Sequence, residues 1–271
     1  MNMSAAEIKR VNVLGVGISV INLNSALAVI LPALADKTKG YVCVTGVHGV
    51  MEAQADENFR GILNRSFLNT PDGIPMVWVG KIRGFKEMDR VYGPDLMLLV
   101  ADRGRAQGCT HFLYGGSEGV AQELKSRLEK KFPEIKIVGT YTPPFRALNA
   151  GEEAELIRTV SQLKPDIFWV GLSTPKQEKF MAQYSAKLDA TLMFGVGAAF
   201  DFHAGRVRQA PRWMQRSGLE WLFRLCSEPR RLWKRYLKNN PRFLWRILGQ
   251  FAGWKKYSLE QARDKKDILF E

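Results

Sequence analysis

Across the first 205 residues, short apolar runs alternate with segments that carry helical patterning, and this alternation is the strongest constraint on the fold. Strands are expected at 11–16, 41–45, 111–114, 135–140, 167–171 and 191–195, with a further short strand just before residue 72. The spacing of apolar residues predicts helices at 25–34, 50–63, 94–105, 118–131 and 151–163, and one that starts at Ser173-Thr174-Pro175. This alternation is typical of an α/β fold with a mainly parallel sheet and helices on both faces.

The pattern changes after Gly205. Residues 206–271 contain 17 Lys and Arg against six Asp and Glu, a net charge of +11, whereas the whole chain carries +13. Amphipathic helices with basic polar faces are predicted at 219–227, 230–237 and 243–251, and Pro241 is expected to break the last two apart. We therefore divide the chain into an α/β core at 1–205 and a basic helical appendage at 206–271, which is expected to fray beyond Lys255.

The appendage also holds five of the seven tryptophans: Trp213, Trp221, Trp233, Trp245 and Trp254. An anionic membrane surface suits both features, since apolar faces bury at the interface and each nearby Lys or Arg adds ~1 kcal/mol. Helices that pack on the core or on a partner are the second alternative. Nucleic acid ranks third, because phosphates attract such charge but no known nucleic-acid motif is present. The apolar faces could equally drive self-association.

Cysteine and histidine spacing argues against disulfide and metal frameworks. The three cysteines form no CxxC motif and are expected to be buried thiols in a reducing compartment: Cys43, Cys109 and Cys226. The three histidines lack metal-ligand spacing, so no zinc site is expected: His48, His111 and His203. No charged residue lies between Val11 and Ala35. This stretch is long enough to span a membrane, which stays a minority alternative. Interruptions by Asn, Gly and Pro instead favour a strand followed by a helix. A signal peptide is also disfavoured.

Several polar residues follow the expected strands, where ligands gather in open parallel sheets. Asp72 could take a proton from a substrate hydroxyl, although Pro-Asp-Gly is also an ordinary turn. Gly115 and Gly116 join a strand to a helix whose first amides could cradle phosphate, yet most Gly-Gly turns hold no ligand. Gln177 and Glu178 lie in the first turn of a helix, where they could contact a base or sugar or simply accompany a capped helix start.

Two further residues and one glycine pair complete the candidates. Arg90, in DRVYGPDL, could pair with a phosphate, although most single arginines are only solvated. Asp201 could position a loop or cap one. Gly15-x-Gly17 follows a strand but lacks a third glycine before a helix, so the dinucleotide fingerprint is not met and no cofactor is expected.

Seven segments, taken in order, resemble the WecG/TagA/CpsF family of bacterial glycosyltransferases over about residues 10–250. They are VTGVHGVMEA (44–53), NTPDGIPMVW (69–78), RVYGPDLM (90–97), FLYGGSEG (112–119), VGLSTPKQEKF (170–180), FGVGAAFDFHAG (194–205) and RQAPRWMQRSGLEWLFRLCSEPRRLWKRYL (208–237). The CpsF-like and GumM-like exopolysaccharide enzymes look nearer than the teichoic-acid branch. The resemblance implies a Rossmann-like α/β core with an appendage that helps close the active site and touches the membrane.

The resemblance also implies a reaction and its place. A hexose or N-acetylhexosamine-type sugar would move, with inversion, from a UDP-sugar to a polyprenyl-diphosphate-linked saccharide at the cytoplasmic face of the bacterial inner membrane. Asp72 matches the family's proposed general base. Thr45 matches a residue that lines the sugar pocket, and Gln177 matches one on the sugar side.

Basic residues match the family's phosphate contacts. Arg90 matches a basic group near the substrate's phosphate, Arg224 and Arg231 match appendage arginines that reach the nucleotide diphosphate, and Arg235 is a weaker match. No DxD pair is present to hold a divalent metal, so arginines are expected to stabilise the leaving diphosphate.

One departure leaves the donor sugar open. Relatives often carry Asn two residues after the threonine at Thr45, whereas this chain has Val47, followed by His48. His48 could replace that polar contact, so UDP-glucose, UDP-N-acetylmannosamine and its uronic acid form all stay open. A non-catalytic, membrane-bound adaptor that binds nucleotide sugars is the alternative from another functional class.

Overall fold

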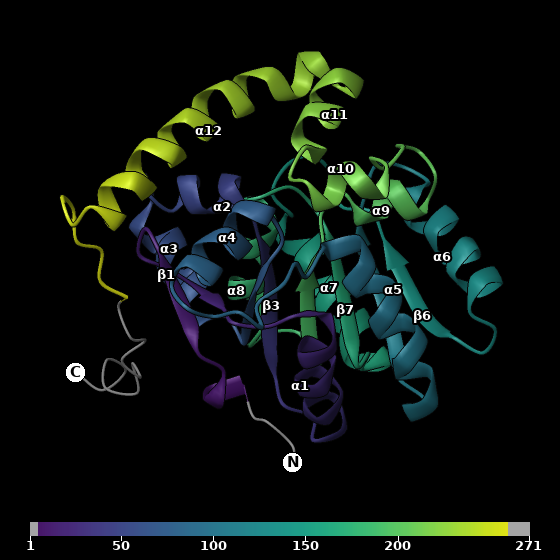
Figure 1. The fold of residues 1–271 in the computed structure, drawn as a ribbon. Coiled ribbons are helices and arrows are strands. Elements are labelled where there is room, and N and C mark those ends of the chain that lie inside the picture. Colours follow the sequence, from purple (N-terminus) through teal and green to yellow (C-terminus); the bar gives the residue numbers. More distant parts are fainter. Residues whose placement is uncertain (1–4, 260–271) are drawn as a thin grey trace.

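The computed structural model describes residues 5–259, and its centre is a six-stranded sheet in the order β4-β3-β8-β7-β5-β6 (Figure 1). Its strands are β3 (Gly40–Thr45), β4 (Leu68–Pro71), β5 (Thr110–Gly115), β6 (Lys136–Tyr141), β7 (Ile167–Gly171) and β8 (Leu192–Gly195). All five pairings in this sheet are parallel. The expected Rossmann-like α/β fold is therefore confirmed.

Helices cover both faces of the sheet, because side chains along each strand alternate between two apolar layers. On β7, Ile167 and Trp169 join one layer, whereas Phe168 and Val170 join the other. The first layer contains α1 (Leu23–Ala35), α5 (Gly93–Gly104), α6 (Val120–Lys131) and α9 (Ala199–His203). The second contains α2 (Val47–Glu52), α3 (Glu57–Arg65), α4 (Ile74–Ile82), α7 (Ala150–Leu163) and α8 (Lys176–Tyr184). Short 3-10 helices form at Ala5–Glu7 (η1) and Arg105–Gln107 (η2).

The strand expected at 11–16 is instead an antiparallel hairpin of β1 (Arg10–Val13) and β2 (Val16–Ser19). Leu14 and Gly15 form its turn with φ of 53° and 84°. Two successive left-handed residues match the right-handed twist of a tight hairpin, and the apolar Leu14 gave no turn signal. The charge-free stretch thus becomes the hairpin and α1. Within residues 5–259, every helix is too short or too polar to cross a bilayer.

Three local expectations in the core are also corrected. The helix expected at 50–63 is two helices, because the Asp56 side chain caps α3 by accepting a hydrogen bond from the Phe59 amide at 3.0 Å. The Pro-Asp-Gly turn considered for Asp72 begins only after Pro71, since β4 continues through that proline. Pro175, rather than Ser173 or Thr174, occupies the N-cap of α8, and the Thr174 hydroxyl donates to Glu178 instead.

Between Arg206 and residue 259, the appendage consists of loops and the helices α10 (Arg212–Arg216), α11 (Glu220–Ser227) and α12 (Pro229–Phe251). The predicted break at Pro241 is wrong, since α12 runs through it as one long, bowed helix (Figure 1). Proline has a helical φ and removes only one amide donor. Pro241 is exposed, so water can satisfy the carbonyl that loses its partner.

The appendage packs on the core through the inner face of α12. Phe243 and Ile247 are buried and belong to the second apolar layer. The Gln250 side chain accepts from the Leu14 amide at 2.9 Å, which ties α12 to the β1–β2 hairpin. The Asn12 side chain donates to the carbonyl of Tyr257 at 2.6 Å, so the chain does not fray directly after Lys255 as expected. Residues 260–271, where fraying was also expected, lie outside the described residues.

The cysteine prediction holds for two of the three thiols. Cys43 and Cys109 are buried in the core, whereas Cys226 is exposed. Cys226 belongs to α11, which lies over the surface of the core and contains no fully buried residue. A small apolar side chain predicts burial only when its element is covered, and the sequence does not reveal that this helix is uncovered.

Candidate active site

A cavity of about 1370 Å³ lies at the carboxyl ends of β3, β4, β5, β7 and β8, with α11 and α12 as its opposite wall. Parallel sheets bind ligands at this edge. The sequence-predicted residues that line it are Asp72, His48, Arg90, Gly116, Gln177, Arg224, Arg231 and Arg235. Thr45, Gly115 and Glu178 lie behind the lining. The fold therefore brings core and appendage candidates to one space.

Asp72 directly follows β4, and its amide donates to the Thr45 carbonyl at 3.1 Å. Its Oδ1 accepts from the Gly93 amide at 3.4 Å and lies 3.8 Å from Nη2 of Arg90. Burial raises the pKa of Asp72 to about 6; Arg90 opposes this shift, and the Glu220 carboxylate adds to it. A recessed carboxyl with this pKa is suited to accept a proton near neutral pH.

Arg90 is held by protein groups on both sides. Its Nε donates to the Asp72 carbonyl, and its Nη2 donates to Oε2 of Glu220 at 2.6 Å. The guanidinium also lies 4.0 Å from the centroid of the Tyr92 ring. The contact with the substrate's phosphate that the sequence suggested stays a prediction. In this structure Arg90 lines the cavity and connects the candidate base to the appendage.

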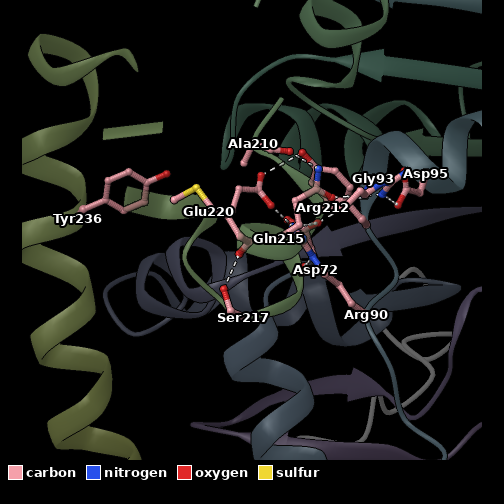
Figure 2. Close-up of polar contacts among 12 residues, drawn as sticks. Asp72, Arg90, Gly93, Asp95, Ala210, Arg212, Gln215, Ser217, Glu220 and Tyr236 are labelled. Atoms are coloured by element: carbon pink, nitrogen blue, oxygen red, sulfur yellow. Dashed lines mark hydrogen bonds and ion pairs between the residues drawn. The ribbon is translucent and has the colours of Figure 1, made fainter. Parts of the chain in front are cut away.

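Glu220 was missed by the sequence reasoning. It opens α11, and its Oε1 accepts from the Tyr92 hydroxyl at 2.9 Å. Its Oε2 accepts from Arg90, which Figure 2 shows beside Asp72. A weak signal was available, because Glu220 and Glu228 are the only acidic residues between 206 and 259, in a strongly basic segment. Nothing in the local pattern, however, linked Glu220 to Arg90, 130 positions earlier in the chain.

Thr45, Gln177 and Glu178 form a buried polar layer at the base of the cavity. Gln177 Nε2 donates to Glu178 Oε1 at 2.9 Å and to the Gly195 carbonyl at 3.3 Å. Burial raises the pKa of Glu178. Among the described residues, neither Thr45 Oγ1 nor Gln177 Oε1 finds a hydrogen-bond partner. Glu178 therefore orients Gln177, which reaches the cavity, whereas Thr45 does not line it.

Close packing between β5 and β7 explains the glycine pair Gly115 and Gly116. A Cβ on Gly115 would lie 2.6 Å from the carbonyl oxygen of Gly171, so only glycine allows these strands to approach at this point. The Gly116 amide donates to that same carbonyl at 2.9 Å. This amide is therefore already engaged and differs from the free amides of a phosphate-binding turn.

Three appendage arginines line the cavity, and Glu228 is the nearby carboxylate. Arg231 forms an ion pair with Glu228 Oε2, and Nη2 of Arg224 lies 3.8 Å from Glu228 Oε1. Within residues 5–259, the buried Nε atoms of Arg224 and Arg235 have no hydrogen-bond partner. Buried donors without acceptors are uncommon in folded proteins, so these two atoms indicate a place for an anionic ligand.

Two other titratable groups line the same cavity. His48 Nδ1 lies 3.1 Å from Nδ2 of Asn239 on α12, and burial lowers the pKa of His48. Burial raises the pKa of Asp201, and the nearby Arg231 opposes that shift. In the described part of the chain, no group of three or more His, Cys, Asp and Glu residues is arranged to hold a metal ion.

Comparisons with known proteins identify the family of this chain. The glycosyl transferase WecG/TagA/CpsF family matches residues 11–257. A relative from Bacillus spizizenii, named N-acetylglucosaminyldiphosphoundecaprenol N-acetyl-beta-D-mannosaminyltransferase, is 29% identical over 236 residues, which cover 86% of this chain and 89% of the relative. A Bacillus subtilis protein of the same name is 29% identical over 212 residues, covering 77% and 79%. The chain is a glycosyltransferase and belongs to the WecG/TagA/CpsF family.

Proposed function

We propose that this protein transfers a sugar, with inversion, from a UDP-sugar to a polyprenyl-diphosphate-linked saccharide used in bacterial surface polysaccharide synthesis, exopolysaccharide included. The observation that carries this proposal is that one cavity holds both the recessed Asp72 carboxyl and the appendage arginines. Asp72 takes the proton of the acceptor hydroxyl while that oxygen bonds to the anomeric carbon. The bond from this carbon to the diphosphate breaks on the opposite face, and its electron pair leaves with UDP.

The leaving diphosphate needs positive charge as that bond breaks. Arg224 and Arg235 each have a buried Nε without a partner among the described residues, and Arg231 lines the same cavity. Fixed cations in a site shielded from water stabilise developing negative charge without having to reorganise. We assign this role to the arginines, with no metal required. We also assign a contact with the sugar to the amide of Gln177, which is buried and lines the cavity.

The names of the two Bacillus relatives make UDP-N-acetylmannosamine the first donor to test and a prenyl-diphosphate-linked N-acetylglucosamine the first acceptor. The experiment is a panel of UDP-sugars, including UDP-glucose and UDP-N-acetylmannosaminuronic acid, read by mass spectrometry of the acceptor. Transfer of one sugar supports the proposal and identifies the donor. UDP-sugar binding without any UDP release in the presence of acceptors would instead favour the non-catalytic adaptor.

The apolar part of the cavity suggests where the prenyl chain of the acceptor lies. Trp78 and Ile82 of α4 and Leu244 and Leu248 of α12 are all exposed, yet all line the same cavity as Asp72. Exposed apolar groups beside a catalytic cavity are typical of a surface that binds an apolar ligand. We therefore place the first isoprene units of the acceptor between α4 and α12.

Leu244→Ser with Leu248→Ser is expected to raise KM for a long-chain prenyl acceptor, by about ten-fold for each leucine lost, because burial of a leucine stabilises by ~1.5–3 kcal/mol. KM for a short, water-soluble acceptor should stay the same. Leu237→Ser is a matched control on the same helix, since Leu237 is 65% exposed, close to 59% and 56% for the two leucines, but does not line the cavity. Equal effects of all three substitutions on the long-chain acceptor would contradict the assignment.

We further propose that the appendage binds the cytoplasmic face of the inner membrane peripherally. Lys234, Lys238 and Arg242 are exposed on α12. Reversing all three to Glu should weaken sedimentation with anionic vesicles by about a hundred-fold or more, since each cation near the surface adds ~1 kcal/mol. Reversing the exposed Lys130, Lys131 and Lys136, on and after α6, is the matched control. Similar losses in both variants would mean that only net charge matters.

Activity is expected to fall in acid because Asp72 must be ionised to accept a proton. Since burial raises its pKa to about 6 from the ordinary 3.8, kcat/KM should drop about ten-fold per unit as the pH falls below 6. Above that pH the base is ionised and this dependence ends. The measurement is kcat/KM from pH 4.5 to 8.5. An acid limb near pH 4 would show that the environment of Asp72 does not raise its pKa during turnover.

A further inference from the structure

We propose that Glu220 is a positioning residue of the transfer reaction, through which the appendage aligns Arg90 against the catalytic base when it covers the cavity. This inference rests on the proposed function and assigns a task to a residue of the family-like segment 208–237 that was not among the predicted site residues. Glu220 does not contact the Asp72 side chain through any hydrogen bond among the described residues. It acts instead through Arg90 and Tyr92.

The contacts of Glu220 divide between its two carboxylate oxygens. Oε2 accepts from Arg90 Nη2 at 2.6 Å, and Oε1 accepts from the Tyr92 hydroxyl at 2.9 Å. The side chains of Arg90 and Glu220 are only 14% and 13% exposed, so the ion pair is shielded from solvent. Charged hydrogen bonds of this kind are short and directional, and they hold a planar guanidinium in one orientation.

Arg90, held in this orientation by Glu220, in turn contacts Asp72, the candidate base. Its Nε donates to the Asp72 carbonyl, its Nη2 lies 3.8 Å from Asp72 Oδ1, and its guanidinium stacks on the Tyr92 ring. Figure 2 shows Asp72, Arg90 and Glu220 close together, with α12 on the other side of the view. Because Glu220 sits on α11, displacement of the appendage would remove one of the three groups that fix Arg90, which are the Asp72 carbonyl, the Tyr92 ring and the Glu220 carboxylate.

Glu220 also contributes to the charge around Asp72. The groups that act on the Asp72 carboxyl are Arg90, Arg224 of α11, the Gly93 amide at the start of α5, and Glu220 itself. The first three favour its ionised form and Glu220 opposes it. Loss of the Glu220 charge should therefore lower the pKa of Asp72, and it would free Arg90 to pair with that carboxylate, which shifts the pKa in the same direction.

A second ion pair between core and appendage provides a matched control. Arg212 Nη1 of α10 donates to Asp95 Oδ2 at 2.7 Å, and Nη2 donates to Oδ1 at 3.1 Å. This pair also joins α5 to the appendage, but Asp95 does not line the cavity. If Glu220 only attaches the appendage to the core, Glu220→Gln and Asp95→Asn should have the same effect on kcat and on the pH profile. If Glu220 positions Arg90, the two variants should differ.

The experiment compares the full-length wild type with Glu220→Gln, Glu220→Asp and Asp95→Asn, using UDP-N-acetylmannosamine and a prenyl-diphosphate-linked N-acetylglucosamine. In Glu220→Gln the acid limb of kcat/KM should move to lower pH, by on the order of one unit, and kcat at pH 8 should fall. Glu220→Asp keeps the charge but is one methylene shorter, so its limb should stay near that of the wild type while kcat falls. Asp95→Asn should leave the limb in place.

The same shift can be followed without turnover, by titrating the carboxyl ¹³C signal of Asp72, assigned through its loss in Asp72→Asn. A Glu220→Gln protein whose Asp72 titrates as in the wild type, and whose kcat falls no more than that of Asp95→Asn, overturns the inference. If the Asp72 signal shifts in Glu220→Gln but neither the wild type nor the variant transfers sugar from any UDP-sugar of the panel, the proposed function is refuted and the electrostatic part of the inference stands. Should Glu220→Gln fail to fold, a Glu220→Asp protein whose kcat falls no more than that of Asp95→Asn would equally overturn the inference.

Discussion

Asp72→Asn is expected to lower kcat for sugar transfer by ~10²–10⁴ while leaving the affinity for the UDP-sugar nearly unchanged. Asparagine has almost the same shape and keeps an oxygen that can accept from the Gly93 amide, a bond of 3.4 Å in the native protein. It cannot take a proton, so the acceptor hydroxyl would attack without a base. Turnover by UDP release and binding by calorimetry separate the two effects.

Asp201 is the informative comparison for that result. It also lines the cavity, and burial raises its pKa as well, so it is another carboxyl there that could act as a base. Asp201→Asn should cost far less turnover than Asp72→Asn. The opposite order would assign the proton transfer to Asp201 and refute the role proposed for Asp72.

Arg224→Ala is expected to lower kcat by ~10²–10³, the range seen when a single fixed donor to developing negative charge is removed. Arg224 sits opposite the sheet in the cavity wall, its side chain is only 18% exposed, and its Nε is buried without a partner in the part of the chain that the structure describes. The substitution should also weaken UDP binding, because we propose that Arg224 contacts the negatively charged diphosphate of this product. Single-turnover kinetics and UDP titration measure both effects.

Arg216 provides the matched control for that prediction. It lies in α10 of the same basic appendage, but it is exposed and does not line the cavity. Arg216→Ala should change turnover little. If Arg216→Ala and Arg224→Ala lowered activity equally, the appendage would act through its overall charge rather than through one placed guanidinium.

Much of the core follows from local pattern. The strands at 41–45 and 167–171 and the helix at 151–163 agree with β3, β7 and α7 to within a residue or so. Each has a signal contained in its own segment: a short apolar run for the strands, and for α7 the Asn149 and Glu152 capping box. Where the signal depends on context, as in the hairpin turn at Leu14 or the continuation of α12 through Pro241, the local pattern misleads.

The candidate site divides in the same way. Asp72 could be found because it follows a strand and matches a family motif, and the structure places it in the cavity wall. Thr45 carried a similar match, yet its side chain lies behind the lining, because strand residues alternate between faces and a motif does not say which face a ligand meets. Glu220 lies within the family-like segment 208–237, but nothing in that segment indicated a role for it, since its partners Arg90 and Tyr92 lie about half a chain away in sequence.

The sequence by itself determined the parallel α/β core, the change to basic helices after Gly205 and the family, because each depends on composition or spacing within short segments. Only the tertiary structure decided how the appendage meets the core. The contacts of Glu220 with Arg90, of His48 with Asn239, and of Gln250 with Leu14 each join residues more than 120 positions apart. Such contacts depend on how whole elements pack, and no local periodicity records them.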